Sequence, residues 1–427
     1  MSATDRTTEP PPALLAPLRA RGFRYLAIGQ LVSSAGNAMY KMALSWLLAA
    51  TTGADGALIG LLAVFQFAPL LLFSGTGGAL VDRLPRRPLL LTTQSAQAAL
   101  SLAMAALAFA GTARTWHIYA LTFASGLVTV VDNPARQRFL TDLVGERGLA
   151  GALGLYSALL NLGQIGGPVL AGLIAGRAHL GWVFAADAVT FLFVAAVVLR
   201  TPRPPRPARA AAAPPRSGGL RTGLREVRGN RHLTAAIAAS VIVGAVGVQF
   251  TVTNTLMAYR EFHLGPTGFA LLPTLITAGC LLGALLAGRH PRPGGTTALL
   301  AAAGTGVASL ATGLAPSYPV FAALMVPTGC VSMFFTTTTA VCLQREAAEQ
   351  VRGRVLAVQT VAFYGGGPLG AFLVGLCGDH LGPRGALLAA GTVTVLLSAG
   401  FLVRHRRPAR GGGQDPPPGP PAPLRTS

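Results

Sequence analysis

Long apolar runs alternate with short polar segments along almost the whole chain. The runs at 57–73 and 88–110 contain no charged residue, and each is close to the roughly 20 residues that cross a bilayer as a helix. The pattern continues to residue 403 and predicts an all-α membrane protein with about twelve spans. We place the spans near 23–49, 57–80, 88–110, 116–135, 149–175, 182–199, 233–258, 267–288, 296–314, 318–342, 353–377 and 384–403.

A Pro- and Arg-rich central loop divides the predicted spans six and six. This division predicts five parts, which are an N-terminal tail (1–22), a six-helix bundle (23–199), the central loop (200–232), a second bundle (233–403) and a basic, Pro-rich disordered tail (404–427). Within the loop, 220–228 spaces apolar residues at helical intervals opposite arginines, which predicts an amphipathic helix against the membrane lipids.

The two halves of the chain show a weak internal repeat. The segment 78–82 is echoed by 283–287, and Arg147-Gly148 is echoed by Arg352-Gly353 at the same offset. Repeated halves are typical of secondary transporters, whose bundles rock about a site near the bilayer midplane. The pattern therefore predicts two pseudo-symmetric bundles.

Charge placement predicts how the chain is oriented. Only 11% of residues are charged, against about a quarter in soluble domains, and the net charge of +20 falls at alternate loops. Arginines concentrate on the cytoplasmic side of bacterial membrane proteins. With a cytoplasmic N-terminus, the outside loops hold only Arg114, Arg177, Arg260 and Arg384. We therefore expect a multi-pass protein of the cytoplasmic membrane with both termini inside, and no nucleic-acid partner.

Several function classes are disfavoured by residues that the sequence lacks. Lys41 is the only lysine, so the chain has no Gly-Lys-Ser/Thr phosphate-binding loop, and any pumping must use an ion gradient or a separate ATPase. The four cysteines lie in or beside apolar runs, as small core residues do. With no metal-ligand cluster and no nucleophile–base arrangement in the sequence, we expect neither an enzyme nor a cofactor or metal.

A charged loop at 78–87 separates the second and third spans. Its key residues are Gly78, Asp82, Arg83, Arg86 and Arg87. The spacing resembles the loop between spans two and three of the major facilitator superfamily, with Pro85 where the usual pattern has glycine. The resemblance runs over residues 20–405 and implies a latch that forms in one transport state and breaks in another. The alternative is a charged turn that only fixes topology.

The fifth span carries a glycine pattern: Gly154, Gly163, Gly167, Pro168 and Gly172. It resembles the antiporter motif of exporters in the same superfamily, with Ala171 in place of one glycine. A helix face without side chains, kinked by proline, allows this span to slide against the opposite half. The resemblance favours export over import, and ordinary small-residue packing is the alternative.

Other segments resemble the bacterial exporter branch of the enterobactin-exporter and macrolide-efflux type. They are Phe23-Arg24-Tyr25-Leu26, Gly29-Gln30-Leu31-Val32-Ser33, Asn133-Pro134-Ala135-Arg136-Gln137, Asp187 with Phe191, and Arg352-Gly353-Arg354-Val355. Two departures matter, because many relatives have Asp where this chain has Asn37, and many proton-coupled antiporters have Arg where it has Thr122.

Ionisable residues inside predicted spans are candidates for function, because they are costly in lipid. They are Lys41, Asp132 and Asp187. At about 1.5 Å per residue, Lys41 and Asp187 lie about 8–12 Å below the outer surface, which predicts an ion pair between them. Either Asp187 or Asp132 is a candidate proton carrier, and purely structural roles remain an alternative for both. For Asp132 that role is a local salt bridge with Arg136, four residues on.

The superfamily resemblance also implies a substrate cavity lined by spans one, four, seven and ten. Its candidate polar and aromatic members, including two from spans two and eleven, are Asn37, Gln66, Gln249, Asn254, Phe334 and Gln359. Amides in membrane helices also make interhelical hydrogen bonds, so packing is an alternative role for each. Such a mixture suits an amphipathic organic molecule and lacks the several cations that a polyanion needs.

The leading hypothesis is a monomeric secondary transporter that exports an amphipathic small molecule in exchange for protons, with the proton gradient as its energy source. One alternative is an uptake carrier of the same fold. Another is a membrane sensor or scaffold that has lost transport, because Ala287 stands in the second half where the first half has Asp82.

Overall fold

The fold was analysed in a computed structural model of the chain, which describes residues 21–201, 220–290 and 292–406. Within these residues every regular element is a helix. The predicted N-terminal tail, the Pro-rich part of the central loop and the C-terminal tail lie almost entirely outside the described residues.

The first half of the chain comprises α1 (Arg21–Thr52), α2 (Gly56–Arg83), α3 (Arg86–Phe109), α4 (Thr115–Arg177) and α5 (Gly181–Arg200). Helix α4 contains two predicted spans. We call its residues before the predicted start of span five at 149 the first arm, and the remainder the second arm. Arg136 in its first arm donates to Gln30 of α1 at 3.4 Å, and the Leu159 carbonyl in its second arm accepts from Ser34 of α1 at 3.5 Å. Both arms therefore pack on α1, and the expected break near 136–148 is helical instead.

The second half begins with the amphipathic α6 (Leu220–Gly229). Predicted span seven consists of four pieces, α7 (Arg231–Ile242), the π-helix η2 (Val243–Gly247), α8 (Phe250–Leu256) and the π-helix η3 (Met257–Glu261). They are followed by α9 (Pro266–Gly288), α10 (Gly295–Gly313), α11 (Tyr318–Glu346) and α12 (Arg352–Arg406). Helix α12 contains the last two spans, which separate at Gly382, where φ is 76°. That left-handed conformation is one that glycine adopts without steric cost.

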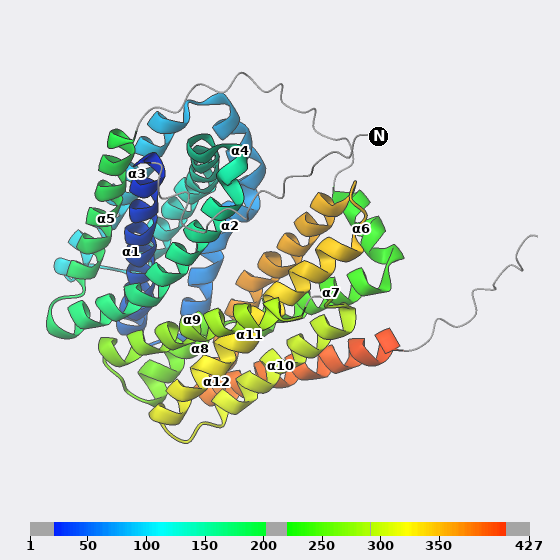
Figure 1. Cartoon of the computed structure of the whole chain (residues 1–427). Coiled ribbons are helices and arrows are strands. Elements are labelled where there is room, and N and C mark those ends of the chain that lie inside the picture. Colours follow the sequence, from blue (N-terminus) through cyan, green and yellow to red (C-terminus); the bar gives the residue numbers. More distant parts are fainter. Residues whose placement is uncertain (1–20, 202–219, 291, 407–427) are drawn as a thin grey trace, which may run out of the picture.

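The two halves form two helical bundles that meet at one end and diverge toward the end where α6 lies (Figure 1). At the closed end, Trp46 of α1 packs on Tyr259 and Phe269 of the second half, with ring centroids 5.6 and 5.4 Å apart. Nearby, the backbones of Gly56 in α2 and Gly375 in α12 lie so close that a side chain on either glycine would overlap the other's carbonyl. This architecture confirms the predicted all-α fold of two bundles.

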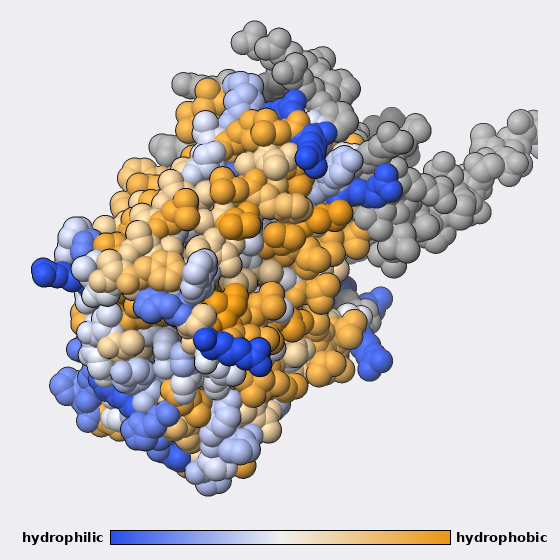
Figure 2. Space-filling model, turned by 90° about the vertical axis from the view of Figure 1, so that its left-hand side faces the viewer, coloured by the Kyte–Doolittle hydropathy of each residue, from blue (hydrophilic) through white to orange (hydrophobic). Residues whose placement is uncertain are grey.

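The surface of the described residues fits a lipid environment. Nine helical stretches among them are long and apolar enough to cross a membrane, by length and composition. One of the nine contains both arms of α12, while α1 and the first arm of α4, which carry more polar residues, are not among them. Figure 2 shows a broad apolar surface with hydrophilic residues gathered toward its ends. Large apolar side chains such as Leu285 (71% exposed) therefore face lipid rather than water.

Candidate functional site

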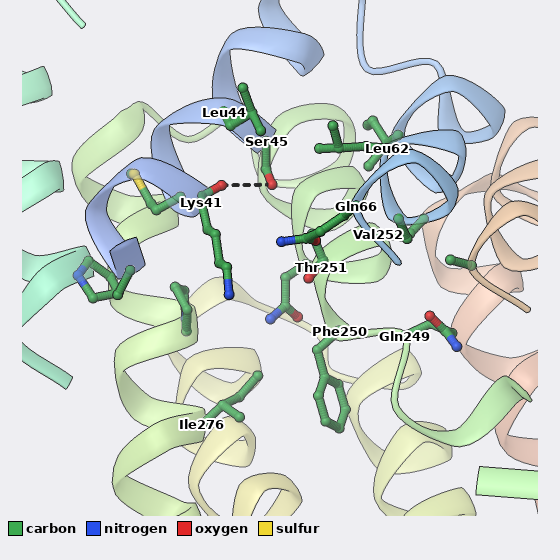
Figure 3. A pocket seen from close by; sticks show the side chains of 18 of the residues that line it. Lys41, Leu44, Ser45, Leu62, Gln66, Gln249, Phe250, Thr251, Val252 and Ile276 are labelled. Atoms are coloured by element: carbon green, nitrogen blue, oxygen red, sulfur yellow. Dashed lines mark hydrogen bonds between the residues drawn. The ribbon is translucent and has the colours of Figure 1, made fainter. Parts of the chain in front are cut away.

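A cavity of about 370 Å³ lies between the two halves (Figure 3). It is lined by residues of α1, α2, the second arm of α4, the break between η2 and α8, and helices α8, α9 and α12. Its polar lining consists of Asn37, Lys41, Ser45, Gln66, Gln164, Gln249, Thr251, Asn254 and Thr277. Four predicted cavity residues therefore line it, namely Asn37, Gln66, Gln249 and Asn254. Phe334 and Gln359 do not, and Phe334 packs on His290 with ring centroids 5.5 Å apart.

The break in span seven brings backbone and side chains into the cavity. The helix widens into η2 and then leaves helical geometry at Val248, where φ is −128° and ψ is 36°. Such a break frees carbonyls that need a donor inside a membrane. Gln249 supplies it, since its amide nitrogen donates to the carbonyls of Gly244 at 2.9 Å and Ala245 at 3.0 Å. Gln249 therefore supports the break, which the sequence did not predict.

Lys41 supplies the charge of the cavity. It sits in the middle of α1, and its side chain points into the space near Gln66 and Ile276 (Figure 3). Although the helix is deep in the bundle, the Lys41 side chain is exposed because the cavity is open. No Asp or Glu is among the described residues that line this cavity.

The predicted ion pair between Lys41 and Asp187 is wrong for this state of the molecule. Asp187 of α5 is only 1% exposed, and its Oδ2 accepts from Ser101 of α3 at 2.7 Å. Its Oδ1 has no hydrogen-bond partner among the described residues and lies against Gly36 of α1. Positions 36 and 41 of a helix are about 140° apart around the axis, so Asp187 and Lys41 face different sides of α1.

Both carboxylate oxygens of Asp132 have partners within a buried polar cluster. Its Oδ2 accepts from Arg136 at 2.9 Å, as the alternative structural role predicted. Its Oδ1 accepts from Thr93 at 2.6 Å and Gln94 at 2.7 Å, both on α3. All four side chains are buried. The two α3 partners were not predicted, and the complete set of contacts favours a structural role over proton carriage.

The structure describes the side chains of only part of the predicted latch, namely Arg86 and Arg87. Gly78, Asp82 and Arg83 are not among the residues whose side chains it describes. Arg86 pairs with Asp142 in the first arm of α4, and Arg87 donates to the Leu199 carbonyl of α5. Both partners belong to the first half of the chain. The described arginines therefore tie the loop to its own bundle, and Asp142 is a partner that the sequence did not single out.

The glycines of the span-five pattern pack in two directions, toward α1 of their own half and toward α9 of the opposite half. A side chain at Gly163 would overlap Ser34 of α1, and one at Gly167 would overlap the backbone of Ala35. Of the pattern's described glycines, Gly172 faces the other half, against Ala270 of α9, and Gly154 faces open space. Pro168 lines the cavity.

Comparison with known proteins identifies the family. The family model described as "transmembrane secretion effector", MFS_3, matches residues 12–416. The chain belongs to the major facilitator superfamily.

Curated relatives within this superfamily include exporters. The chain is 28% identical over 392 residues to the multidrug efflux pump Tap of Mycolicibacterium fortuitum, covering 88% of this chain and 94% of the relative. It is 22% identical over 375 residues to macrolide efflux protein A of Streptococcus pyogenes, covering 87% and 92%. It is 22% identical over 380 residues to the staphyloferrin A transporter of Staphylococcus aureus, covering 87% and 93%.

Solved structures of the superfamily share the fold. The nucleoside transporter NupG superposes with a TM-score of 0.74 at 13% identity, covering 91% of this chain and all of that one. An inward-facing bacterial homologue of the lysosomal transporter Spinster gives 0.71 at 15% identity, covering 91% and 97%. As a member of the major facilitator superfamily, the chain is a multi-pass membrane transporter of small molecules and not an enzyme.

The closed end of this transporter contains an inter-bundle contact that the sequence did not predict. Asp379, in the first arm of α12, accepts from the backbone nitrogens of Gly56 at 2.8 Å and Ala57 at 2.9 Å, at the start of α2. Arg260 pairs with the same carboxylate at 2.9 Å and donates to the Gly53 carbonyl at 3.4 Å. A carboxylate is stabilised at a helix N-terminus, so this contact holds the two bundles together.

The close packing of span five on α1 gives a direct test. Gly167→Ala is expected to lower the stability of the purified transporter by about 1–3 kcal/mol, because the added methyl group meets the Ala35 backbone and the Ala38 side chain. Thermal unfolding in detergent measures the loss. Gly166→Ala is the matched control, since no atom lies within 4 Å of a side chain added there. Equal melting temperatures for both variants would contradict this prediction and would show that α1 and α4 can separate enough to admit the methyl group without loss of stability.

Proposed function

We propose that this transporter exports an amphipathic small molecule across the cytoplasmic membrane in exchange for protons, by alternating access. The observation that carries the proposal is a cavity between the two bundles that is closed at one end by contacts such as Trp46 with Phe269. The efflux relatives, Tap and macrolide efflux protein A, support export as the direction.

The distribution of arginines supports an orientation with both termini in the cytoplasm. In that orientation the start of α2, where Asp379 binds, is at the outer face, and the divergent end with α6 is at the inner face. The structure then corresponds to an inward-facing state, in which a substrate enters the cavity from the cytoplasm. Anionic lipid around the basic α6 fits the same orientation.

The proton gradient is the proposed energy source, with no bound cofactor, and the transporter is proposed to work as a monomer. Asp187 is the best placed carrier of the coupling proton. It is a buried carboxyl with one hydrogen-bond donor and one free oxygen, lying directly behind the helix that carries Lys41. Taking up a proton there removes a charge from a medium of low dielectric constant.

Inside-out membrane vesicles test the proposal. With an acidic interior, vesicles containing the transporter are expected to accumulate members of a labelled amphipathic panel, and an ionophore that collapses the pH gradient should abolish accumulation. Accumulation that survives the ionophore would exclude proton antiport. Transport found only in right-side-out vesicles would establish the uptake alternative, and failure of the whole panel in both orientations would favour a sensor or scaffold.

A further inference from the structure

We propose that the cavity selects amphipathic molecules that carry one anionic group, and that Lys41 binds that group. The proposal deepens the proposed transport function and rests on it, because it names the charge class of the transported molecule. Its basis is the set of charged residues around the cavity. Lys41, the only lysine of the chain, is the one charged side chain among the described residues that line it.

Lys41 has no polar partner for its side chain among the residues that the structure describes. Its ammonium group makes no ion pair within the described residues, and no described acid lines the cavity. The described acids at the closed end have partners of their own. Asp379 pairs with Arg260, Glu261 pairs with Arg384 at 2.7 Å, and Asp55 accepts from the Leu58 nitrogen at 2.9 Å. Asp187 lies behind α1 and is bound by Ser101. An ammonium group left unpaired among membrane helices is costly, so its position is suited to a ligand's charge.

The surroundings of Lys41 fit a ligand with one polar end. The amides of Asn37, Gln66 and Asn254 line the same cavity and offer further hydrogen-bond donors to an anionic oxygen. The aromatic rings of Phe250 and Phe269 supply apolar lining. With one cation and neutral amides, the cavity can neutralise a single carboxylate, sulfonate or phenolate, whereas a polyanion would leave charges unpaired.

The same arrangement disfavours a cationic ligand. A cation would meet the Lys41 ammonium and find no carboxylate among the described lining residues. Like charges brought together in a partly desolvated site repel one another and suppress binding. The charge of the cavity lining therefore favours anionic over cationic ligands, both in binding and in transport.

Three fluorescent or radiolabelled aromatic probes of different charge test this in the full-length transporter in nanodiscs. The first is 8-anilino-1-naphthalenesulfonate, an amphipathic monoanion. The second is N-phenyl-1-naphthylamine, which has the same rings without the sulfonate. The third is the cation tetraphenylphosphonium. Wild type is expected to bind the sulfonate at least about tenfold more tightly than the neutral amine, as a charge-assisted hydrogen bond implies, and to bind the cation least.

Two substitutions assign the preference to Lys41. Lys41→Met keeps the length and apolar stem of the side chain and is expected to lose the tenfold preference, while its affinity for the neutral amine changes by less than about twofold. Lys41→Arg keeps the charge and should retain the preference. A wild type that binds the amine or the cation as tightly as the sulfonate would overturn the proposal, as would a Lys41→Met variant that keeps the sulfonate preference.

These experiments test the anion-binding proposal and the export proposal independently. If the nanodisc preference is found but inside-out vesicles move none of the three probes, the charge selectivity stands and the export proposal loses its support. If the vesicles accumulate the cation or the amine under a proton gradient, but the sulfonate shows no Lys41-dependent binding, export stands and the anion proposal is wrong.

Discussion

Asp187→Asn is expected to reduce gradient-driven accumulation in inside-out vesicles to the level of vesicles without the transporter. Asparagine has nearly the shape of aspartate and can still accept the Ser101 hydrogen bond, which is 2.7 Å long in the structure. It cannot take up and release a proton. If Asp187 carries the coupling proton, the variant still binds substrate in the cavity, because the side chain lies on the other face of α1.

Exchange of substrate without a gradient separates this role from a structural one. A variant that has lost only the proton should still exchange labelled for unlabelled substrate across the membrane, since exchange needs the alternation of states and no net proton movement. Full gradient-driven accumulation by Asp187→Asn would show that Asp187 is only a hydrogen-bond acceptor for Ser101.

Asp132→Asn is the matched control, because Asp132 and Asp187 are the two buried acids among the described side chains of the first bundle. It carries a full set of partners, including Arg136 at 2.9 Å. Removing one charge of a buried pair leaves the other uncompensated and destabilises by about 3–5 kcal/mol. We expect Asp132→Asn to lower expression, accumulation and exchange together, which contrasts with the selective loss expected at Asp187.

The sequence was sufficient for the fold because the membrane imposes a simple rule on it. Backbone polar groups in lipid must be satisfied within helices, so each apolar run of sufficient length predicts a span. The pairing of Asp132 with Arg136 was also predictable, because it depends only on a spacing of four residues along one helix.

Contacts between helices were harder to predict, because depth in the membrane does not determine direction around a helix axis. Lys41 and Asp187 have similar predicted depths, yet α1 lies between the cavity and the Asp187 carboxylate. The same reason applies to span five, where the glycine spacing indicated a close approach but not its direction. In the structure Gly163 and Gly167 approach α1 of the same half, and Gly172 approaches α9 of the other half. The break in span seven had only a weak signal, the glycines Gly244 and Gly247 before Gln249, because glycines and single amides also occur in intact membrane helices.

The Asp379 contact did have a signal in the sequence. Gly375 and Asp379 repeat the four-residue spacing of Gly78 and Asp82, and each pair stands at the far end of its span, eleven or two. Helices α2 and α12 run antiparallel, since Gly56 lies against Gly375 and Phe67 lies near Tyr364, with ring centroids 6.0 Å apart.

Asp379→Ala is therefore expected to open the outer end of the transporter. It removes the acceptor of the Gly56 and Ala57 nitrogens and the partner of Arg260. An anion at a helix N-terminus contributes up to about 2 kcal/mol in a partly buried site. Its loss corresponds to a shift of roughly 5–30-fold between closed and open populations. Spin labels at Thr51 of the first half and His263 of the second half measure the change as a longer distance across the outer end.

Glu261→Gln is the control that separates closure from general loosening. The pair of Glu261 with Arg384 lies close in sequence to the Asp379 contact, but both partners belong to the second half. Breaking it removes a salt bridge without removing a link between the bundles, so the distance between labels should stay as in wild type. If both variants lengthen that distance equally, the outer end is held by its general charge balance. If neither does, the apolar contact of Trp46 with Phe269 is sufficient to keep it closed.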